Sequence, residues 1–537
     1  MAEQGQPARP TASERPAPSE RPASSGSPAP SGRPAPSGRR ALPRLPVVAV
    51  LGAGLLVGVL AGGPGAPRAA SPPGVAASAV SVVAPADAVS SAWYCAGATD
   101  VRSGAASGRL LLVDSGGRAV RAAVRIVSDA GRSRSLAVVV AARSSATLPE
   151  TVPGGAAWVG AEVTFDGGSA SVEQETSGPL GATLQPCATA VSPSWYFASG
   201  ETLVNATTTI ILLDPGAAPA IVDLSFTTDE GREVPSELQG LVVPAGGMVV
   251  VPLRSRLRRR SYIATTVSTS SGSVVAWEVE AVARPAKGAV ILGTKAALAP
   301  LADPASPFEG VVEVPGAPGA STRWWWPDGG TARGTSEVYR IYDPGARTAR
   351  VSLSVALDEG SAEPFLLTVG PGQVATLPTS ASARIPAGVP YGAFLHSLNG
   401  VPVVAERTLV ASYPSSERGS VGVVGATLPA TQWLLGAPRV GGDRLVGIAV
   451  AAVSGGRTAV RLDSLVSGSL VPVRGLGPLE LSGDAPFVVD LAHLPEPLPG
   501  PLALVASHPV VASVQLADPG RAGGLTESLG TPVLPRG

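Results

Sequence analysis

Catalysis and metal binding usually rely on histidine, cysteine and paired carboxylates, and this chain has few places where such side chains gather. The three histidines are His396, His493 and His508, and no carboxylate or cysteine stands at metal-ligand spacing from them. Acidic pairs such as Asp229-Glu230 and Asp358-Glu359 precede a glycine, which is typical of solvated hairpin turns. The pattern therefore predicts no catalytic residue, no metal site and no cofactor.

The phrase Asp114-Ser115-Gly116-Gly117 is similar to the nucleophile segment of chymotrypsin-like proteases. That mechanism needs a histidine base and an aspartate, which precede the serine in those proteases, and the first histidine here is His396. Asp214-Pro215-Gly216 and Asp343-Pro344-Gly345 occupy the same place after an apolar run. We therefore interpret all three phrases as turns that end a strand.

One cluster of positive charge suggests contact with a polyanion. Five arginines fall within seven residues near the end of a predicted strand: Arg254, Arg256, Arg258, Arg259 and Arg260. Anionic wall polymers or lipid headgroups would suit them, and a solvated loop with counter-ions is the alternative. The formal net charge of the whole chain is zero, so no general field favours nucleic acid.

A cluster of aromatic side chains suggests contact with a glycan. Trp324, Trp325 and Trp326 are consecutive, and side chains alternate between the two faces of a strand. At least one ring must therefore face away from its own hydrophobic core. That ring could stack on a sugar, or it could pack against the neighbouring module, which we expect to be the second one.

The tryptophans also mark a repeat. Trp93, Trp195, Trp324 and Trp433 open successive units at intervals of roughly 100 to 130 residues, which is the size of a domain. A short phrase recurs near the end of each unit: Leu180-Gly181-Ala182-Thr183, Leu292-Gly293-Thr294-Lys295, Val424-Gly425-Ala426-Thr427 and Leu529-Gly530-Thr531-Pro532. The chain is predicted to be an array of four copies of one module.

Within each unit the apolar residues alternate with period two, and turn residues arrive every eight to twelve positions. This pattern predicts an all-β chain with four tandem Ig-like β-sandwich modules. Propeller blades run about 40–50 residues, so the period excludes them. The predicted modules are residues 89–190, 191–300, 321–430 and 431–537, with a linker at 301–320.

The chain has two cysteines, Cys95 and Cys187, and they bracket the first module. We expect a disulfide that ties its first strand to its last, with two buried free thiols as the alternative. In the loop-entropy model such a crosslink stabilises by about 4–5 kcal/mol, and it requires an oxidising compartment.

The N-terminal part predicts a membrane anchor. Leu45–Gly63 carries no charge and would be about 28 Å long as a helix, enough to cross the hydrocarbon core. Arginines precede this span, so the N-terminus is expected in the cytoplasm and residues 64–537 outside. Residues 1–44 are a predicted disordered leader rich in Pro, Ser and Arg, and residues 64–88 a predicted stalk. A cleaved signal peptide is the competing interpretation.

The landmarks together resemble a known family. Trp195-Tyr196-Phe197-Ala198-x-Gly200, then Leu212-Leu213-Asp214-Pro215, then Val243-Pro244-Ala245-Gly246, then Val403-Val404-Ala405-Glu406-Arg407 is similar to the actinobacterial family of unknown function DUF5719. The likeness covers roughly residues 90–537. Cysteine replaces phenylalanine at position 95, and Trp433-Leu434-Leu435 lacks the second aromatic. The resemblance implies an extracytoplasmic, membrane-tethered envelope protein of a high-GC Gram-positive bacterium.

These observations favour a non-catalytic, membrane-anchored cell-surface protein whose modules form an extended array for scaffolding or supporting the assembly of envelope polymers. The expected partners are the membrane, through Leu45–Gly63, and cell-wall glycan or envelope proteins. A carbohydrate-binding surface protein, a transmembrane sensor that signals through residues 1–44, and an enzyme with a site between modules are the alternatives.

Overall fold

The computed structural model divides the chain into two units, Met1–Pro73 and Gly74–Gly537, and every described residue belongs to the second. The described residues are 80–99, 107–178, 181–203, 206–282, 310–357, 360–411, 415, 418–436, 445–453, 456–482, 486–491, 494, 498, 500–518 and 523–535. The predicted leader, the predicted span Leu45–Gly63 and residues 64–79 of the predicted stalk lie outside them. Within the described ranges, no helix has the length and apolar character needed to cross a membrane.

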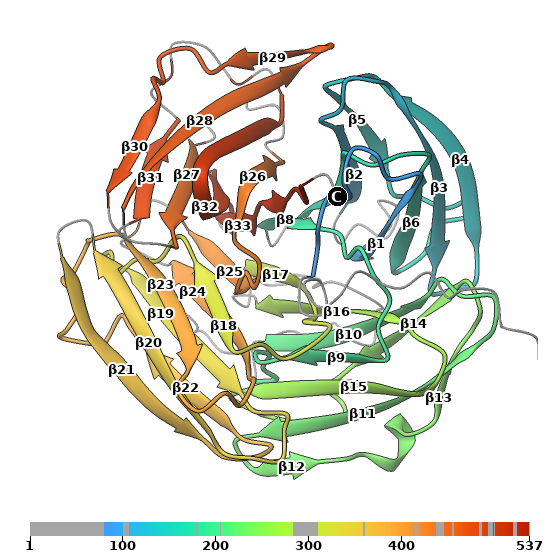
Figure 1. The fold of residues 1–537 in the computed structure, drawn as a ribbon. Helices are drawn as coiled ribbons and strands as arrows, with labels where there is room; N and C mark the ends of the chain where they lie inside the picture. Colours follow the sequence, from blue (N-terminus) through green and yellow to red (C-terminus); the bar gives the residue numbers. More distant parts are fainter. Residues whose placement is uncertain are drawn as a thin grey trace, which may run out of the picture. The chain divides into compact units, whose positions relative to one another are not determined.

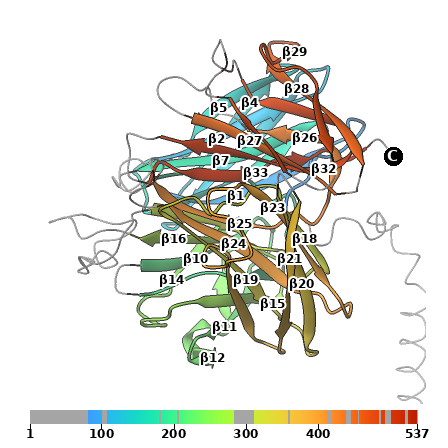
Figure 2. The same ribbon diagram turned by 90° about the vertical axis from the view of Figure 1, so that its left-hand side faces the viewer.

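The described part is all-β, as predicted, and is built from antiparallel sheets with no α-helix (Figures 1 and 2). Module 1 has two four-stranded sheets, with strand orders β1-β6-β3-β4 and β5-β2-β7-β8, and buried side chains from both sheets share one hydrophobic cluster. Its strands are β1 (Ser91–Ala98), β2 (Ser107–Asp114), β3 (Val120–Ser128), β4 (Ser133–Val140), β5 (Ser144–Pro149), β6 (Val159–Phe165), β7 (Ala170–Gly178) and β8 (Gly181–Pro186).

Module 2 repeats this plan with the orders β12-β11-β15-β9, in which β13 also pairs with β11, and β14-β10-β16-β17. Its elements are β9 (Ser194–Phe197), β10 (Ala206–Asp214), β11 (Ala220–Thr228), β12 (Gly231–Glu233), the 3-10 helix η2 (Ser236–Leu238), β13 (Leu241–Val243), β14 (Gly247–Pro252), β15 (Ile263–Ser271), β16 (Val275–Val282) and β17 (Gly310–Pro315). The strand β17 lies inside the range 301–320 that the sequence suggested as a linker, and it pairs with β16 as the last strand of the module.

Module 3 has the orders β18-β23-β20-β21 and β22-β19-β24-β25. Its strands are β18 (Arg323–Trp326), β19 (Thr335–Tyr342), β20 (Ala349–Leu357), β21 (Ser361–Val369), β22 (Val374–Pro378), β23 (Tyr391–Ser397), β24 (Val404–Ala411) and β25 (Gly419–Val424).

In module 4 the two sheets are joined, because the long strand β32 pairs with β26 and β28 in its first part and with β27 and β33 in its second. Its strands are β26 (Ala430–Leu435), β27 (Leu445–Ala452), β28 (Arg457–Val466), β29 (Ser469–Pro472), β30 (Leu479–Ser482), β31 (Pro486–Asp490), β32 (Leu502–Ala517), β33 (Thr526–Leu529) and β34 (Thr531–Pro532).

The tryptophans that open the modules are structurally equivalent and buried. In three modules the indole N–H donates to a backbone carbonyl in, or directly before, a later core strand of the same module: Trp195 to Val274 at 2.7 Å, Trp324 to Val403 at 2.9 Å and Trp433 to Val510 at 3.0 Å. Each of these contacts lies within one module and holds its opening strand to a later core strand. The three modules therefore share this structural feature.

The last strands of the four modules meet in a strand junction made of β8, β17, β25 and β33. The strand β8 contacts β17, β17 contacts β25, β25 contacts β33, and β33 contacts β8 again (Figure 1). The extended array that the sequence suggested is therefore wrong for the described residues, because module 4 contacts module 1 and closes the cycle.

Part of the predicted stalk takes part in this closure. Val83 forms a parallel bridge with Val533, and its N–H donates to the carbonyl of Pro532 at 2.9 Å. The hydroxyl of Ser81 donates to the carbonyl of Cys187 at 2.7 Å. Residues 80–84 thus lie between module 1 and the end of module 4.

Candidate functional site

The phrases that resembled a protease nucleophile are turns, as the sequence indicated. In each of three modules the aspartate carboxylate accepts a hydrogen bond from the N–H two residues later: Gly116 to Asp114 and Gly216 to Asp214 at 2.7 Å, and Gly345 to Asp343 at 2.8 Å. One carboxylate oxygen of each buried aspartate at a strand end is thus bound within its own turn. These side chains have a structural role.

The predicted disulfide is present, with sulfurs of Cys95 and Cys187 bonded and the Cα atoms 4.8 Å apart. It joins β1 to the residue that follows β8, so it ties the first strand of module 1 to its last.

The other modules place a large side chain over glycine at the two positions of the disulfide. A Cβ on Gly316 would lie 2.8 Å from the Phe197 ring, and one on Gly425 would lie 2.8 Å from the Trp326 ring. Cysteine therefore replaces both members of this contact in module 1.

The residue after each opening tryptophan packs into the core of the next module. Tyr94 packs against the core cluster of module 2, Tyr196 against that of module 3, and Trp325 against that of module 4. Leu434 belongs to the core cluster of module 1. Four equivalent apolar contacts thus close the same cycle as the strand junction.

Buried glutamates add polar contacts between neighbouring modules. Glu173 of module 1 accepts a hydrogen bond from the N–H of Gly436 in module 4 at 2.8 Å. At the equivalent position of module 3, Glu406 accepts from the N–H groups of Ala198 and Ser199 in module 2, at 3.3 and 3.1 Å. Modules 1 and 2 are joined through Glu313, which accepts hydrogen bonds from two hydroxyl groups of module 1.

In β17 both carboxylate oxygens of Glu313 are bound by module 1. Thr176 donates to Oε1 at 2.8 Å and Thr183 to Oε2 at 2.9 Å. Burial raises the pKa of Glu313 to about 7, and the two hydroxyl groups lower it in part. The strand junction therefore contains a buried carboxyl group that is hydrogen-bonded across the boundary between modules 1 and 2.

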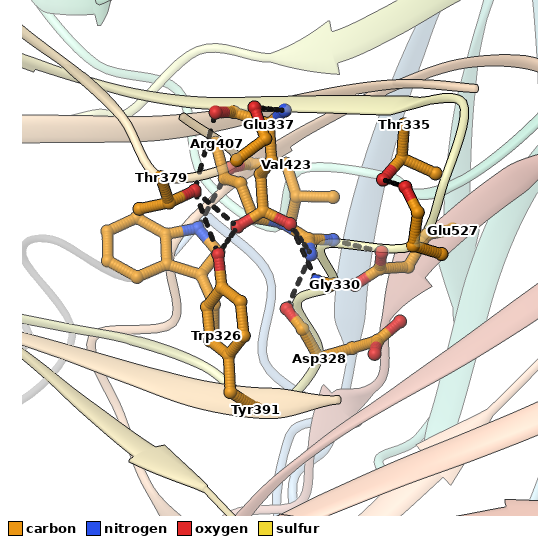
Figure 3. A network of polar contacts seen from close by, with 12 residues as sticks. Trp326, Asp328, Gly330, Thr335, Glu337, Thr379, Tyr391, Arg407, Val423 and Glu527 are labelled. Atoms are coloured by element: carbon orange, nitrogen blue, oxygen red, sulfur yellow. Dashed lines mark hydrogen bonds and ion pairs between the residues drawn. The ribbon is translucent and has the colours of Figure 1, made fainter. Parts of the chain in front are cut away.

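Modules 3 and 4 are joined by Arg407, which is fully buried (Figure 3). Its guanidinium forms ion pairs with Glu337 of its own module, at 3.5 Å, and with Glu527 of module 4. The hydroxyl of Tyr391 donates to Glu337 on the other side. Burial raises the pKa of Glu527 to about 8, although Arg407 lowers it in part. One guanidinium faces two carboxyl groups, so we expect one of them to hold a proton near neutral pH.

The arginine cluster does not present five equivalent free charges. Arg260 forms ion pairs with Glu230 at 2.8 Å and Glu233 at 2.6 Å, and it anchors the loop after β14. Arg258 and Arg259 are exposed at the turn, where they remain available to a polyanion. The polyanion contact stays a prediction.

The tryptophan cluster divides as the alternation predicted. Trp324 and Trp326 are buried in the core of module 3, and Trp325 lies on the opposite face of β18. The Trp325 ring packs against module 4, whereas the sequence suggested module 2. It also stacks on Phe394, with ring centroids 5.0 Å apart and planes at 19°, and Phe394 stacks on His396 at 5.3 Å.

Trp325 and Phe394 border a cavity of about 580 Å³ between modules 3 and 4, which we call the aromatic groove. On the side of module 3 it is lined by Trp325, Ser354, Ala356, Gly392 and Phe394, and on the side of module 4 by residues 451–453 and Ser482. This size is in the range of small-molecule sites. Of the residues that sequence reasoning singled out, only Trp325 lines it.

Sequence reasoning missed Phe394, Ser354 and Gly392. A single phenylalanine in a strand is usually interpreted as a core residue. Its register partner in the sheet could have revealed it: Phe394 stands opposite Trp325, whose two neighbours are buried. His493 lies outside the described residues, and His508 is exposed beside Ser507. In the part of the chain that the structure describes, no three His, Cys, Asp or Glu side chains are placed to hold a metal ion.

The fold and these contacts define an all-β protein of antiparallel sheets, most of them four-stranded, in four linked modules. The chain belongs to the family of unknown function DUF5719, whose sequence model matches residues 168–469.

No curated protein matches the chain. Two solved structures are similar in part. The crystal structure of Thermotoga maritima 1070 is 19% identical and covers 20% of this chain and 93% of that chain, with a TM-score of 0.18. The crystal structure of Streptomyces avermitilis alpha-L-rhamnosidase complexed with L-rhamnose is 11% identical and covers 79% of this chain and 55% of that chain, with a TM-score of 0.12. At these scores neither likeness carries an argument about fold or function.

Proposed function

We propose that this chain is a non-catalytic, membrane-anchored protein of the bacterial cell surface, and that its modules are Ig-like β-sandwiches that serve as a scaffold for the assembly of envelope polymers. The paired sheets around shared cores support the Ig-like interpretation. The uncharged stretch Leu45–Gly63 after a run of arginines supports the anchor.

One observation carries the scaffold proposal. At each contact between neighbouring modules, buried polar groups hold one module to the next: Glu313 to Thr176, Glu406 to Ser199, Arg407 to Glu527, and Glu173 to Gly436. Catalytic sites usually leave perturbed carboxyl groups facing a cleft, whereas these four contacts lie inside the protein. These buried polar groups hold the modules in fixed positions, as a scaffold requires. Partners would then bind to the outer surfaces of the modules.

The disulfide supports the outer location, because structural disulfides form and persist in oxidising compartments. The decisive experiment tests the membrane anchor and the outer location of the modules in intact cells. The full chain with a C-terminal tag is produced in a Gram-positive host, and protease is added outside. We expect the tag to be removed from the outside while the leader stays with the membrane fraction. A protected tag would contradict the proposed topology.

The same cells provide a test of the disulfide. Denatured but unreduced protein should not react with a maleimide polymer, whereas reduced protein should gain two labels, one at Cys95 and one at Cys187. For the scaffold role, cells that lack the chain should incorporate labelled sugar into wall polymers more slowly. An unchanged rate would contradict that role and leave the topology result intact.

A further inference from the structure

We propose that the aromatic groove between modules 3 and 4 binds a neutral carbohydrate. The inference depends on the proposed surface location only for access to such a glycan, because binding to the purified chain tests it directly.

The register of the sheet builds one wall of the groove. Trp325 stands opposite Phe394, and Phe394 stands opposite Ser354, so the three side chains form a row on one face of β18, β23 and β20. The buried residues Trp324 and Trp326 fix this face as the outer one. The row is therefore held by the core beneath it.

Small residues make the groove hollow. Gly392 lies two residues before Phe394, opposite Ala356, and both line the groove. A Cβ on Gly392 would lie 3.6 Å from the Cβ of Ala451, so module 4 approaches closely enough to form the second wall. Larger residues at these two positions would fill the space.

The side chains that line the groove are complementary to a neutral sugar. None of the described residues that line the groove is charged, and the polar side chains among them are the hydroxyl groups of Ser354, Ser361 and Ser482. A sugar ring has an apolar C–H face for the aromatic rings and hydroxyl groups for the serines. An anionic polymer would bring a charge that none of these described lining residues pairs, and burying an unpaired charge is costly.

The equivalent sites between the other modules lack this combination. Between modules 1 and 2 the place of Phe394 is taken by Glu162, which forms an ion pair with Arg125 at 4.0 Å. Between modules 2 and 3 it is taken by Thr266, whose hydroxyl bonds the Tyr342 hydroxyl at 2.8 Å. Module 3 thus carries an aromatic side chain at a position that is polar in modules 1 and 2 and that is Ala503 in module 4.

The test uses the purified full chain in detergent and electrophoresis through gels that contain mannan, galactan or dextran, with polygalacturonate as the anionic polymer. We expect at least one neutral polymer to retard the chain and polygalacturonate to have no such effect. Calorimetry with an oligosaccharide of the retarding polymer then gives the dissociation constant.

Two variants change the groove in different ways. Phe394→Ala removes half of the ring pair, and Ala356→Phe fills the floor while keeping both rings. Each should raise the dissociation constant at least tenfold, which is about 1.4 kcal/mol. Glu162→Ala is the matched control, because it alters the equivalent site of module 1 and should leave binding unchanged.

Binding that persists at full strength in Ala356→Phe would overturn the proposal, as would equal loss in Glu162→Ala. If Phe394→Ala melts at a lower temperature than the natural chain, Ala356→Phe decides the question. Failure of all three neutral polymers to retard the chain also overturns the proposal, including the case in which an apolar peptide binds instead. None of these results bears on membrane topology. The proposed function can therefore fail or hold independently of carbohydrate binding.

Discussion

The buried carboxyl group of Glu173 gives the sharpest test of how the modules are joined. Burial raises its pKa from 4.5 to about 8, and the N–H of Gly436 lowers it in part. The folded chain therefore binds this proton more tightly than the unfolded chain. The stabilising contribution is complete below pH 4.5 and is lost as the pH rises toward 8. The difference between about 8 and 4.5, at 1.36 kcal/mol per pKa unit, is about 5 kcal/mol.

Glu173→Gln keeps the shape and the acceptor for Gly436 but does not ionise. The variant and the natural chain should have similar free energies of unfolding at pH 4.5, and the variant should become more stable by up to about 5 kcal/mol at pH 9. Urea unfolding at several pH values measures the difference, and other titrating groups cancel because distant sites are additive. Glu237→Gln, at an exposed position of η2, is the control. A difference that does not grow with pH would refute the argument.

Four further variants test this contact and others of the described fold. Gly436→Ala should destabilise the chain by about 1–3 kcal/mol, because the new Cβ would lie 1.6 Å from the Glu173 carboxylate. Arg407→Met should cost about 3–5 kcal/mol, because it leaves two buried carboxyl groups without their partner. Replacing Cys95 and Cys187 by serine should cost about 4–5 kcal/mol. Replacing them by phenylalanine and glycine should recover part of that loss, because this pair fills the same site in module 2. Thermal and urea unfolding measure all of these.

Matched controls separate these mechanisms from general damage. Gly447→Ala should be nearly neutral, because its new Cβ would have no neighbour closer than 3.8 Å. Arg384→Met breaks a pair with Glu363 at 3.8 Å, and both side chains are exposed, by 45% and 78%, so the cost should stay below about 1 kcal/mol. Equal losses in Arg384→Met and Arg407→Met would contradict the role given to burial.

Sequence reasoning recovered what local pattern and chemistry determine. Period-two alternation predicted the strands, and the aspartate-glycine phrases predicted turns that the bonds to Asp114, Asp214 and Asp343 confirm. The spacing of two cysteines predicted the disulfide. Each of these features depends on residues within one module.

The closed cycle of modules could not be predicted in the same way, because its contacts join residues far apart in sequence. A glutamate such as Glu406 in an apolar strand gives no sign that its partner is Ser199 of another module. The alternation showed that Trp325 faces outward, and only the structure identifies module 4 as its neighbour.

The repeated closing phrase was partly misaligned. Gly425 and Gly530 are equivalent, since each donates its N–H to an alanine carbonyl on the preceding core strand. In module 1 the equivalent residue is Cys187, which donates to Val172, and Gly181 stands at the other end of β8. Leu180-Gly181 resembled the closing phrase by chance, because glycine is common in this chain.

The correct alignment explains why the disulfide occurs in module 1. At the first position the modules carry Cys95, Phe197, Trp326 and Leu435, and at the second they carry Cys187 and then glycine in the other three. A Cβ at Gly530 would lie 2.4 Å from the Leu435 side chain, so glycine is required wherever the first residue is large. Once the first residue becomes as small as cysteine, the space above the second can hold a sulfur atom, and the covalent bond replaces the lost packing. The departure at position 95 is therefore one half of a paired substitution.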